Sequence, residues 1–115
     1  MQYMLLIHAA EAARQNLTEA DIGRMVAAYG AYTEALSKAG ALLSGNRLRP
    51  AGSATTVRIV DGKTQVVDGP YGETREQLGG YYLIDVADLD AAIGWAARCP
   101  GASFGAIEVR PVWAM

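Results

Sequence analysis

The side chains best suited to acid–base chemistry gather in one stretch of the chain, between positions 68 and 76. Its ionisable residues are Asp68, Tyr71, Glu73, Arg75 and Glu76. A proline and two glycines in the same stretch favour a tight turn that holds side chains in fixed directions. Carboxylates beside a guanidinium bind polar ligands or transfer protons. We therefore expect a ligand site here, with Asp68 as a catalytic acid or base; the alternative is a structural turn with solvated charges.

His8 is the only histidine of the chain and stands where an N-terminal apolar run stops. Histidine is the side chain that ordinarily titrates near neutral pH. His8 is therefore a second candidate for general acid–base catalysis. The alternative is a histidine at the end of a strand that hydrogen-bonds a loop.

Arg47 and Arg49 alternate after a short predicted strand, so an extended backbone points both side chains the same way. They are candidates for clamping a carboxylate or phosphate, with solvated surface charges as the alternative. Tyrosines are candidates for the wall of a pocket that takes an apolar or aromatic ligand, with core or interface packing as the alternative. They are Tyr29, Tyr71, Tyr81 and Tyr82, of which Tyr71 and Tyr82 are assigned to the ligand site.

Length and composition predict one globular domain without a metal or cofactor. The chain has 115 residues, of which 51% are hydrophobic and 19% are charged, enough for a single core. The net charge of −2 provides no positive field for nucleic acid. Metal-type Cys/His spacings and nucleotide or nucleophile motifs are absent from the sequence. We expect Cys99, the single cysteine, to be an inert core residue.

The expected location is the cytoplasm. The N-terminal apolar run is too short for a signal peptide and lacks a basic flank. No stretch approaches the ~20 apolar residues of a membrane span. The sequence therefore predicts neither membrane association nor direct contact with nucleic acid.

The elements that must position these residues occur in the order β-α-β, β-hairpin, β-α-β. Strands are predicted at residues 2–8, 41–45, 55–60, 63–67, 79–86 and 105–110. A turn at Asp61-Gly62 pairs Val57 with Val66 in the hairpin. Glu108 and Arg110 share one face of the last strand, and their spacing leaves both solvent and a dimer cleft open. This order predicts an α+β domain with two helices on one face of an antiparallel sheet.

Both predicted helices have defined ends and an apolar face. Thr18 caps the first, which ends near Ala39-Gly40, and Asp88 caps the second, which Pro100-Gly101 stops. The apolar face of the first helix contains Ile22, Met25, Val26, Tyr29, Thr33 and Leu36. The predicted buried face of the second contains Leu89, Ala92, Ile93, Ala96 and Cys99.

The strands at 3–7, 57–59 and 81–86 are apolar on both faces. A chain of this length has no further elements to cover the second face of a sheet, and a large exposed apolar face is unfavourable. We therefore expect a second copy to cover it in a homodimer, with a large, core-like interface.

The run Asp68-Gly69-Pro70-Tyr71 closely resembles the sequence that names the DGPF-domain group of the YCII-related family. The downstream run from Glu76 to Tyr82 resembles the same group, and the likeness spans nearly the whole chain. It implies a single YCII-related, DGPF-type domain over residues 1–115, with a ferredoxin-like βαβ(β-hairpin)βαβ fold that dimerises as an α+β barrel. Members of the family that it resembles are expected to carry a histidine–aspartate pair with the histidine in the first helix. The corresponding region of this chain, around Ala28-Tyr29-Gly30, has no histidine, so the chain departs from that pattern.

Two function classes are consistent with this sequence. The first is a small-molecule-binding protein with acid–base enzyme activity in a polar cleft near the 68–76 loop. Its catalytic residues are His8 and Asp68, and its ligand-binding residues are Arg47, Tyr71, Glu73, Arg75 and Tyr82. The second is a noncatalytic sensor or accessory module. The DGPF resemblance implies for that module an association with an alternative sigma factor in transcription regulation.

Overall fold

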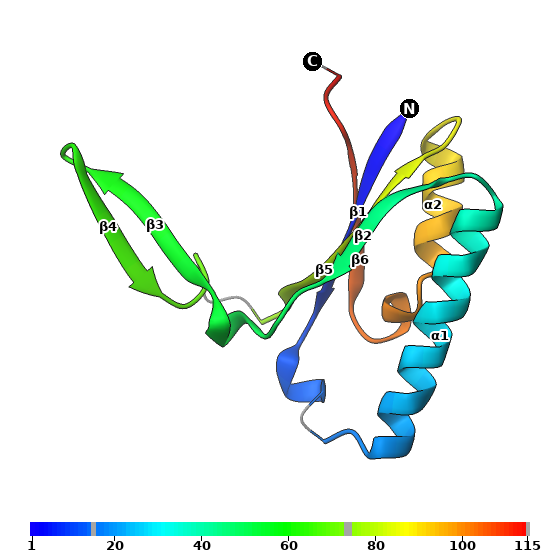
Figure 1. Ribbon diagram of the computed structural model, residues 1–115, viewed down its shortest axis with the longest axis horizontal. Coiled ribbons are helices and arrows are strands. Elements are labelled where there is room, and N and C mark those ends of the chain that lie inside the picture. The colour runs from blue at the N-terminus through cyan, green and yellow to red at the C-terminus, as the bar shows by residue number, and fades with distance from the viewer. Residues whose placement is uncertain (15, 73–74, 115) are drawn as a thin grey trace.

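Two helices cover one face of a four-stranded antiparallel sheet in the computed structural model, which describes residues 1–14, 16–72 and 75–114 (Figure 1). The strands of this sheet are β1 (Gln2–Ala9), β2 (Leu42–Arg47), β5 (Gln77–Asp85) and β6 (Ala106–Pro111). Their spatial order is β2-β5-β1-β6. The helices are α1 (Glu19–Lys38) and α2 (Leu89–Arg98). Antiparallel pairing with two βαβ crossovers makes this a ferredoxin-like α+β fold, as predicted.

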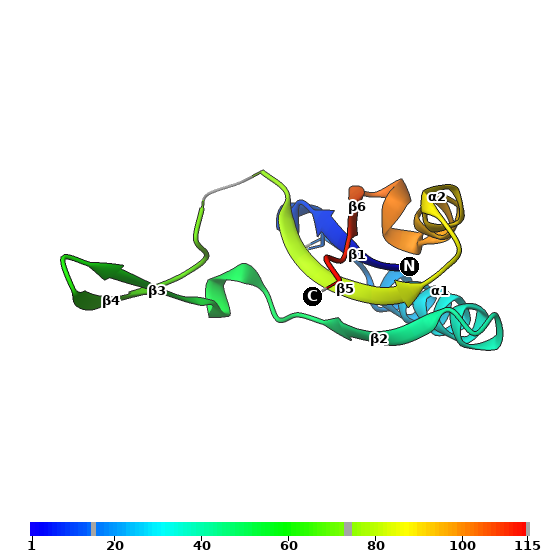
Figure 2. The ribbon, with the colours of Figure 1, turned by 90° about the horizontal axis from the view of Figure 1, so that it is seen from above.

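The predicted hairpin forms a separate two-stranded sheet. Strand β3 (Thr55–Val60) pairs with β4 (Lys63–Asp68), and Val57 lies opposite Val66 as predicted. Asp61 and Gly62 have φ angles of 52° and 76°, the mirror-image turn that suits a twisted hairpin. The hairpin projects from the sheet on the side away from the helices (Figures 1 and 2). The Cα radius of gyration is therefore 16.0 Å, against about 13 Å for a compact chain of this length.

The helix ends follow the predicted caps. The Thr18 hydroxyl accepts a hydrogen bond from the Asp21 amide, and the Asp21 carboxylate accepts one from the Thr18 amide. This capping box satisfies two amides that the first turn of α1 leaves without partners. Gly40 follows the end of α1 with a φ of 72°, a left-handed conformation that glycine adopts without strain. The Asp88 carboxylate caps α2 through the Ala91 amide at 2.9 Å.

The core lies between the sheet and the helices. Alternation along β1 buries Tyr3, Leu5 and Ile7 on the helix side. Tyr32 of α1 is central to the core. Its ring packs edge-on against the rings of Tyr82 and Trp95, with distances between ring centroids of 5.4 Å and 6.1 Å. The core also contains buried residues of the helices, of β5 and of the end of α2, namely Leu36, Ile84, Ala92, Ala96 and Cys99.

The predicted buried face of α2 is wrong at two positions. Leu89 and Ile93 are 48% and 50% exposed, whereas Ala92, Ala96 and Cys99 are buried. The buried stripe of α2 consists of small residues, which let the helix backbone approach the sheet closely. Leu89 and Ile93 lie beside that stripe, so the two larger aliphatic side chains remain in contact with water. No helix within the described ranges has the length and apolarity needed to cross a membrane.

The sheet face opposite the helices is open. Met4, Leu6 and Leu83 lie on this face and are partly exposed. In the described part of the chain, no helix lies over them (Figure 2). The hairpin, which stands on this side of the sheet, also exposes aliphatic side chains. Its exposed aliphatic residues are Val57, Ile59, Val60, Val66 and Val67.

Candidate ligand-binding site

A groove of about 440 Å³ lies between the N-terminal half of α1 and the sheet edge formed by β2 and β5. Its size is within the range of small-molecule sites. Its aliphatic wall comes mainly from α1 and the segment before it, through Leu17, Ile22, Met25 and Val26. Its aromatic wall comes from Tyr29, Tyr81 and Tyr82. The walls are therefore largely apolar.

The groove exists because α1 is covered only along its C-terminal half. A helix of 20 residues is about 30 Å long. Leu36, near its C-terminal end, is fully buried, whereas Ile22 and Val26 are 47% and 59% exposed. The same apolar face thus packs against the sheet at one end and borders open space at the other.

Glycines on the neighbouring strands keep the floor of the groove free of side chains. Gly45 of β2 and the pair Gly79-Gly80 of β5 all line it. A Cβ atom at Gly45 would lie 2.7 Å from the Tyr82 ring, and one at Gly80 would lie 3.0 Å from the Asn46 carbonyl oxygen. Both positions therefore require glycine for the close approach of ring and backbone.

Polar groups occur at defined places along this apolar surface. The hydroxyls of Thr33 and Tyr82 lie 2.7 Å apart in a partly buried contact. Burial raises the pKa of Tyr82, and its hydrogen bond with Thr33 opposes that change only in part. The Tyr82 hydroxyl is therefore neutral at physiological pH. On the open face of the same strands, β2 and β5, Asn46 donates a hydrogen bond to the Tyr81 hydroxyl at 2.9 Å.

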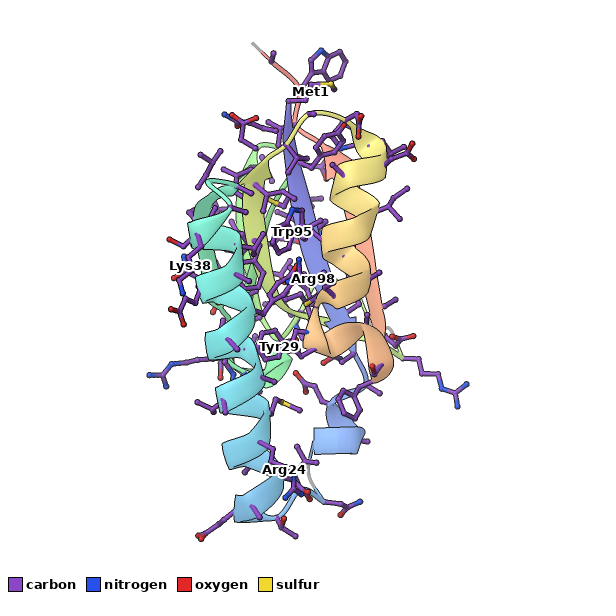
Figure 3. The ribbon with its side chains drawn as sticks, turned by 90° about the vertical axis from the view of Figure 1, so that its right-hand side faces the viewer. Met1, Arg24, Tyr29, Lys38, Trp95 and Arg98 are labelled. Atoms are coloured by element: carbon purple, nitrogen blue, oxygen red, sulfur yellow. The ribbon has the colours of Figure 1, made fainter. Side chains whose placement is uncertain are left out.

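Tyr29 connects the groove with the core. Figure 3 shows it between α1 and α2, where its hydroxyl lies 3.9 Å from the Cys99 sulfur. Burial raises the pKa of the Cys99 thiol, and the residue as a whole is 2% exposed. Cys99 is therefore a buried, protonated core residue, as expected.

His8 lies on the open face of the sheet, outside the groove lining. Its Nε2 atom is 3.0 Å from Oε1 of Glu108, on the adjacent strand β6. The other oxygen of Glu108 is 3.5 Å from Nε of Arg110. The sheet register places Glu108 and Arg110 with His8 on this face. An imidazole, a carboxylate and a guanidinium thus lie next to one another on the open face. Whether solvent or a second copy lies against them stays a prediction.

The structure separates the residues predicted to form one site. Arg47 and Tyr82 line the groove, together with Tyr29 and Tyr81. Asp68 ends β4 in the projecting hairpin, and it does not line the groove.

The described residues after β4, 69–72, lie outside the groove lining, like Asp68. Tyr71 is 77% exposed, and the Arg58 guanidinium lies 4.7 Å from the centre of its ring. Arg75 is exposed and also outside the groove lining. Glu73 lies outside the described residues. The catalytic roles of His8 and Asp68, and the ligand-binding roles of the loop residues, stay predictions.

Sequence reasoning selected three of the lining tyrosines, Tyr29, Tyr81 and Tyr82, but missed the aliphatic wall and the glycine floor of the groove. The spacing of Ile22, Met25 and Val26 indicates one helical face, but periodicity does not show whether a sheet covers that face. The signal for the floor is the Gly79-Gly80 pair inside an otherwise aromatic strand. A glycine inside a strand marks a close approach by another backbone or a ligand.

Comparisons with known proteins found a matching family and a relative of this chain. A family model described as the YCII-related domain matches residues 1–115. The chain belongs to the YCII-related family. A curated relative, the uncharacterized protein R00369 of Rhizobium meliloti (strain 1021), is 38% identical over 114 residues. That alignment covers 97% of this YCII-related chain and 92% of the relative. The narrower assignment to the DGPF-domain group stays a prediction.

Proposed function

We propose that this YCII-related protein binds a small, largely apolar molecule in the groove between α1 and the β2–β5 edge, and that it works in the cytoplasm. The observation that carries the proposal is the uncovered apolar face of α1. Ile22 and Val26 are 47% and 59% exposed, and both border the same hollow of about 440 Å³. Apolar side chains that converge on a concave surface are typical of a ligand site.

The groove supports binding more than catalysis. Its described lining contains no carboxylate, imidazole or thiol, and Arg47 is its one charged residue. Acid–base catalysis at neutral pH uses a group that titrates near that pH. The lining therefore favours the noncatalytic alternative, a sensor or accessory module. A link to an alternative sigma factor rests on the DGPF resemblance alone.

A second candidate function is acid–base catalysis on the open sheet face. The observation that favours it is the 3.0 Å contact between His8 and Glu108. A carboxylate that orients an imidazole is a common arrangement for a general base. If this function is correct, His8→Gln should abolish turnover of a bound substrate and leave the affinity of the α1 groove unchanged. Asp68→Ala tests the contribution of the loop in the same assay.

A titration with the neutral fluorescent dye Nile red tests binding in the groove. Ile22→Asn removes an apolar contact from the groove and should weaken binding on the order of fivefold. Ile93→Asn is the matched control, because Ile93 is also helical, is 50% exposed and lies outside the groove lining. Equal effects of the two substitutions, or no saturable binding by the unaltered protein, would contradict the proposal.

We also propose that two copies associate through their open sheet faces, as the predicted dimeric α+β barrel. Support comes from the partly exposed Met4, Leu6 and Leu83 on that face, and from the hairpin that projects on the same side (Figure 2). An isolated two-stranded hairpin is marginally stable in water. A second copy on the open face would be positioned to cover Val57, Ile59 and other aliphatic residues of the hairpin.

A further inference from the structure

We infer that the ligand of the α1 groove is an amphipathic carboxylate, with its apolar body against α1 and its carboxylate at Arg47. This inference rests on the proposed function and specifies the class of ligand. Its basis is the distribution of charge and hydrogen-bond donors along the groove.

Arg47 is the one charged side chain in the described lining. No carboxylate among the described residues lies within ion-pair distance of its guanidinium, although the chain carries 12 acidic and 10 basic residues. The side chain is exposed. A guanidinium binds a carboxylate through two parallel hydrogen bonds, which gives both affinity and orientation.

The surroundings of Arg47 leave room for such a head group. Arg47 is the last residue of β2 and lies opposite Gly80 of β5. Because Gly79 and Gly80 have no side chains, the strand beside the guanidinium presents only backbone. A planar carboxylate therefore has access to this end of the groove from the open side.

The hydroxyls near this part of the groove are neutral donors. Asn46 and Tyr81, one position along from Arg47 and Gly80, direct their hydrogen-bonded side chains to the open face of the sheet, because Tyr81 lies opposite Leu6. The hydroxyls of Thr33 and Tyr82 share one hydrogen bond, which uses one of their two protons and leaves the other available. The charged donor is thus on the strand side of the groove, whereas the α1 side is apolar.

The charge near the start of α1 favours a singly charged ligand. Glu19 and Asp21 lie in the first turn, immediately before the groove residue Ile22. Asp21 is paired with Arg24, so the start of α1 offers no free cation of its own to a second anionic group. The single guanidinium of Arg47 neutralises one anion. A monocarboxylate with an aromatic or aliphatic body matches this distribution: its charge pairs with Arg47, and its apolar part packs against α1.

The test compares ligands that share a naphthalene ring and differ in the head group and its charge. Isothermal titration calorimetry with 2-naphthoate, 2-naphthylmethanol and 2-naphthylmethylammonium keeps the ring constant while the charge changes. The unaltered protein should bind the carboxylate on the order of tenfold more tightly than the alcohol, and the ammonium compound most weakly. Arg47→Gln should reduce the ratio of the carboxylate and alcohol affinities to about one, as expected when a charge-assisted hydrogen bond is lost.

Arg49→Gln is the matched control. Arg49 is also an exposed arginine, two positions further along the chain, and it does not line the groove. This variant should retain the preference for the carboxylate. A preference that Arg49→Gln removes, and Arg47→Gln does not, would overturn the inference.

Two other outcomes separate the ligand class from the groove itself. If all three compounds bind equally and Ile22→Asn weakens each of them, the groove binds apolar molecules but the carboxylate assignment is wrong. If none binds and Nile red does not bind either, both the ligand class and the proposed function are wrong. The melting temperatures of the two arginine variants should match that of the unaltered protein, because both side chains are exposed.

Discussion

The hydroxyl of Thr33 on α1 lies 2.7 Å from the hydroxyl of Tyr82 on β5. This contact joins helix to sheet at the boundary between the covered and uncovered halves of α1. Beyond it toward the C-terminus, Leu36 is fully buried, and toward the N-terminus, Val26 is 59% exposed. The pair therefore marks where the core ends and the groove begins.

Removing one member of this pair should destabilise the fold measurably. Thr33→Val preserves the shape of the side chain but leaves the partly buried Tyr82 hydroxyl without its partner. We expect a loss of about 1 kcal/mol in the free energy of unfolding in urea. The double variant Thr33→Val/Tyr82→Phe should lose less than the sum of the single losses. Strictly additive losses would show that the two hydroxyls do not interact.

Stability should decline in alkaline solution because of two buried tyrosines. Burial raises the pKa of Tyr82 and of Tyr32 above the ordinary value of 10.0. The unfolded chain therefore loses these protons first. Burial also raises the pKa of the Cys99 thiol from 9.0, so the thiol adds a decline that begins at lower pH. The two tyrosines lower the free energy of unfolding once the pH exceeds about 10. Below that pH both groups are protonated in both states, so their contribution is fully present.

Chemical denaturation between pH 8 and 11 measures this effect. Tyr32→Phe should make the decline shallower, whereas Tyr71→Phe should leave it unchanged because Tyr71 is 77% exposed. An equal change in both variants would mean that burial of Tyr32 is not the cause.

Alanine substitutions at two glycines, Gly105 and Gly30, should change the free energy of unfolding in opposite directions. A Cβ atom at Gly105 would lie 2.0 Å from the His8 carbonyl oxygen, so Gly105→Ala forces β1 and the start of β6 apart. Gly30, on the exposed surface of α1, has no atom within 4 Å of such a Cβ. Gly30→Ala should raise the free energy of unfolding by about 0.5–1 kcal/mol. Thermal melts that rank the variants in the reverse order would contradict this packing.

Much of the fold could be predicted because its signals are local. The Asp61-Gly62 turn and the Thr18 cap depend on neighbouring residues, and both are confirmed. The burial of Leu89 and Ile93 was wrong, because helical periodicity does not determine how wide a stripe the sheet covers. Strand ends moved by one or two residues, as with β2, which runs over 42–47 and was predicted over 41–45.

The candidate site was harder to predict because tertiary contacts create it. His8 meets Glu108 only because β1 pairs with β6, which places Leu6 opposite Glu108. No spacing along the chain indicates that contact across 100 positions. The groove likewise depends on how far α1 extends past the β2–β5 edge. Arg47 and Tyr82 were selected by residue type, and the structure brings them to one groove.

The proposed dimer predicts a specific sensitivity in the hairpin. Sedimentation equilibrium at low micromolar concentration should give twice the chain mass of 12.2 kDa. Ile59→Arg places a charge on the 67% exposed hairpin residue and should weaken association, because a buried unpaired charge is costly. Ile93→Arg, on the helix side of the sheet, should leave association unchanged. A stable, folded monomer of the unaltered protein would contradict the dimer.

The most direct test of ligand binding in the α1 groove is an amide chemical-shift map of the ¹⁵N-labelled protein titrated with 2-naphthoate. If the ligand binds in the groove, the largest amide shifts should occur at residues that line it from both sides, namely Ile22, Met25, Gly45 and Gly80. Amides near His8 and Asp68 should shift little. Shifts concentrated around His8 or Asp68, with the α1 residues unchanged, would contradict the central claim and locate the ligand elsewhere on the molecule.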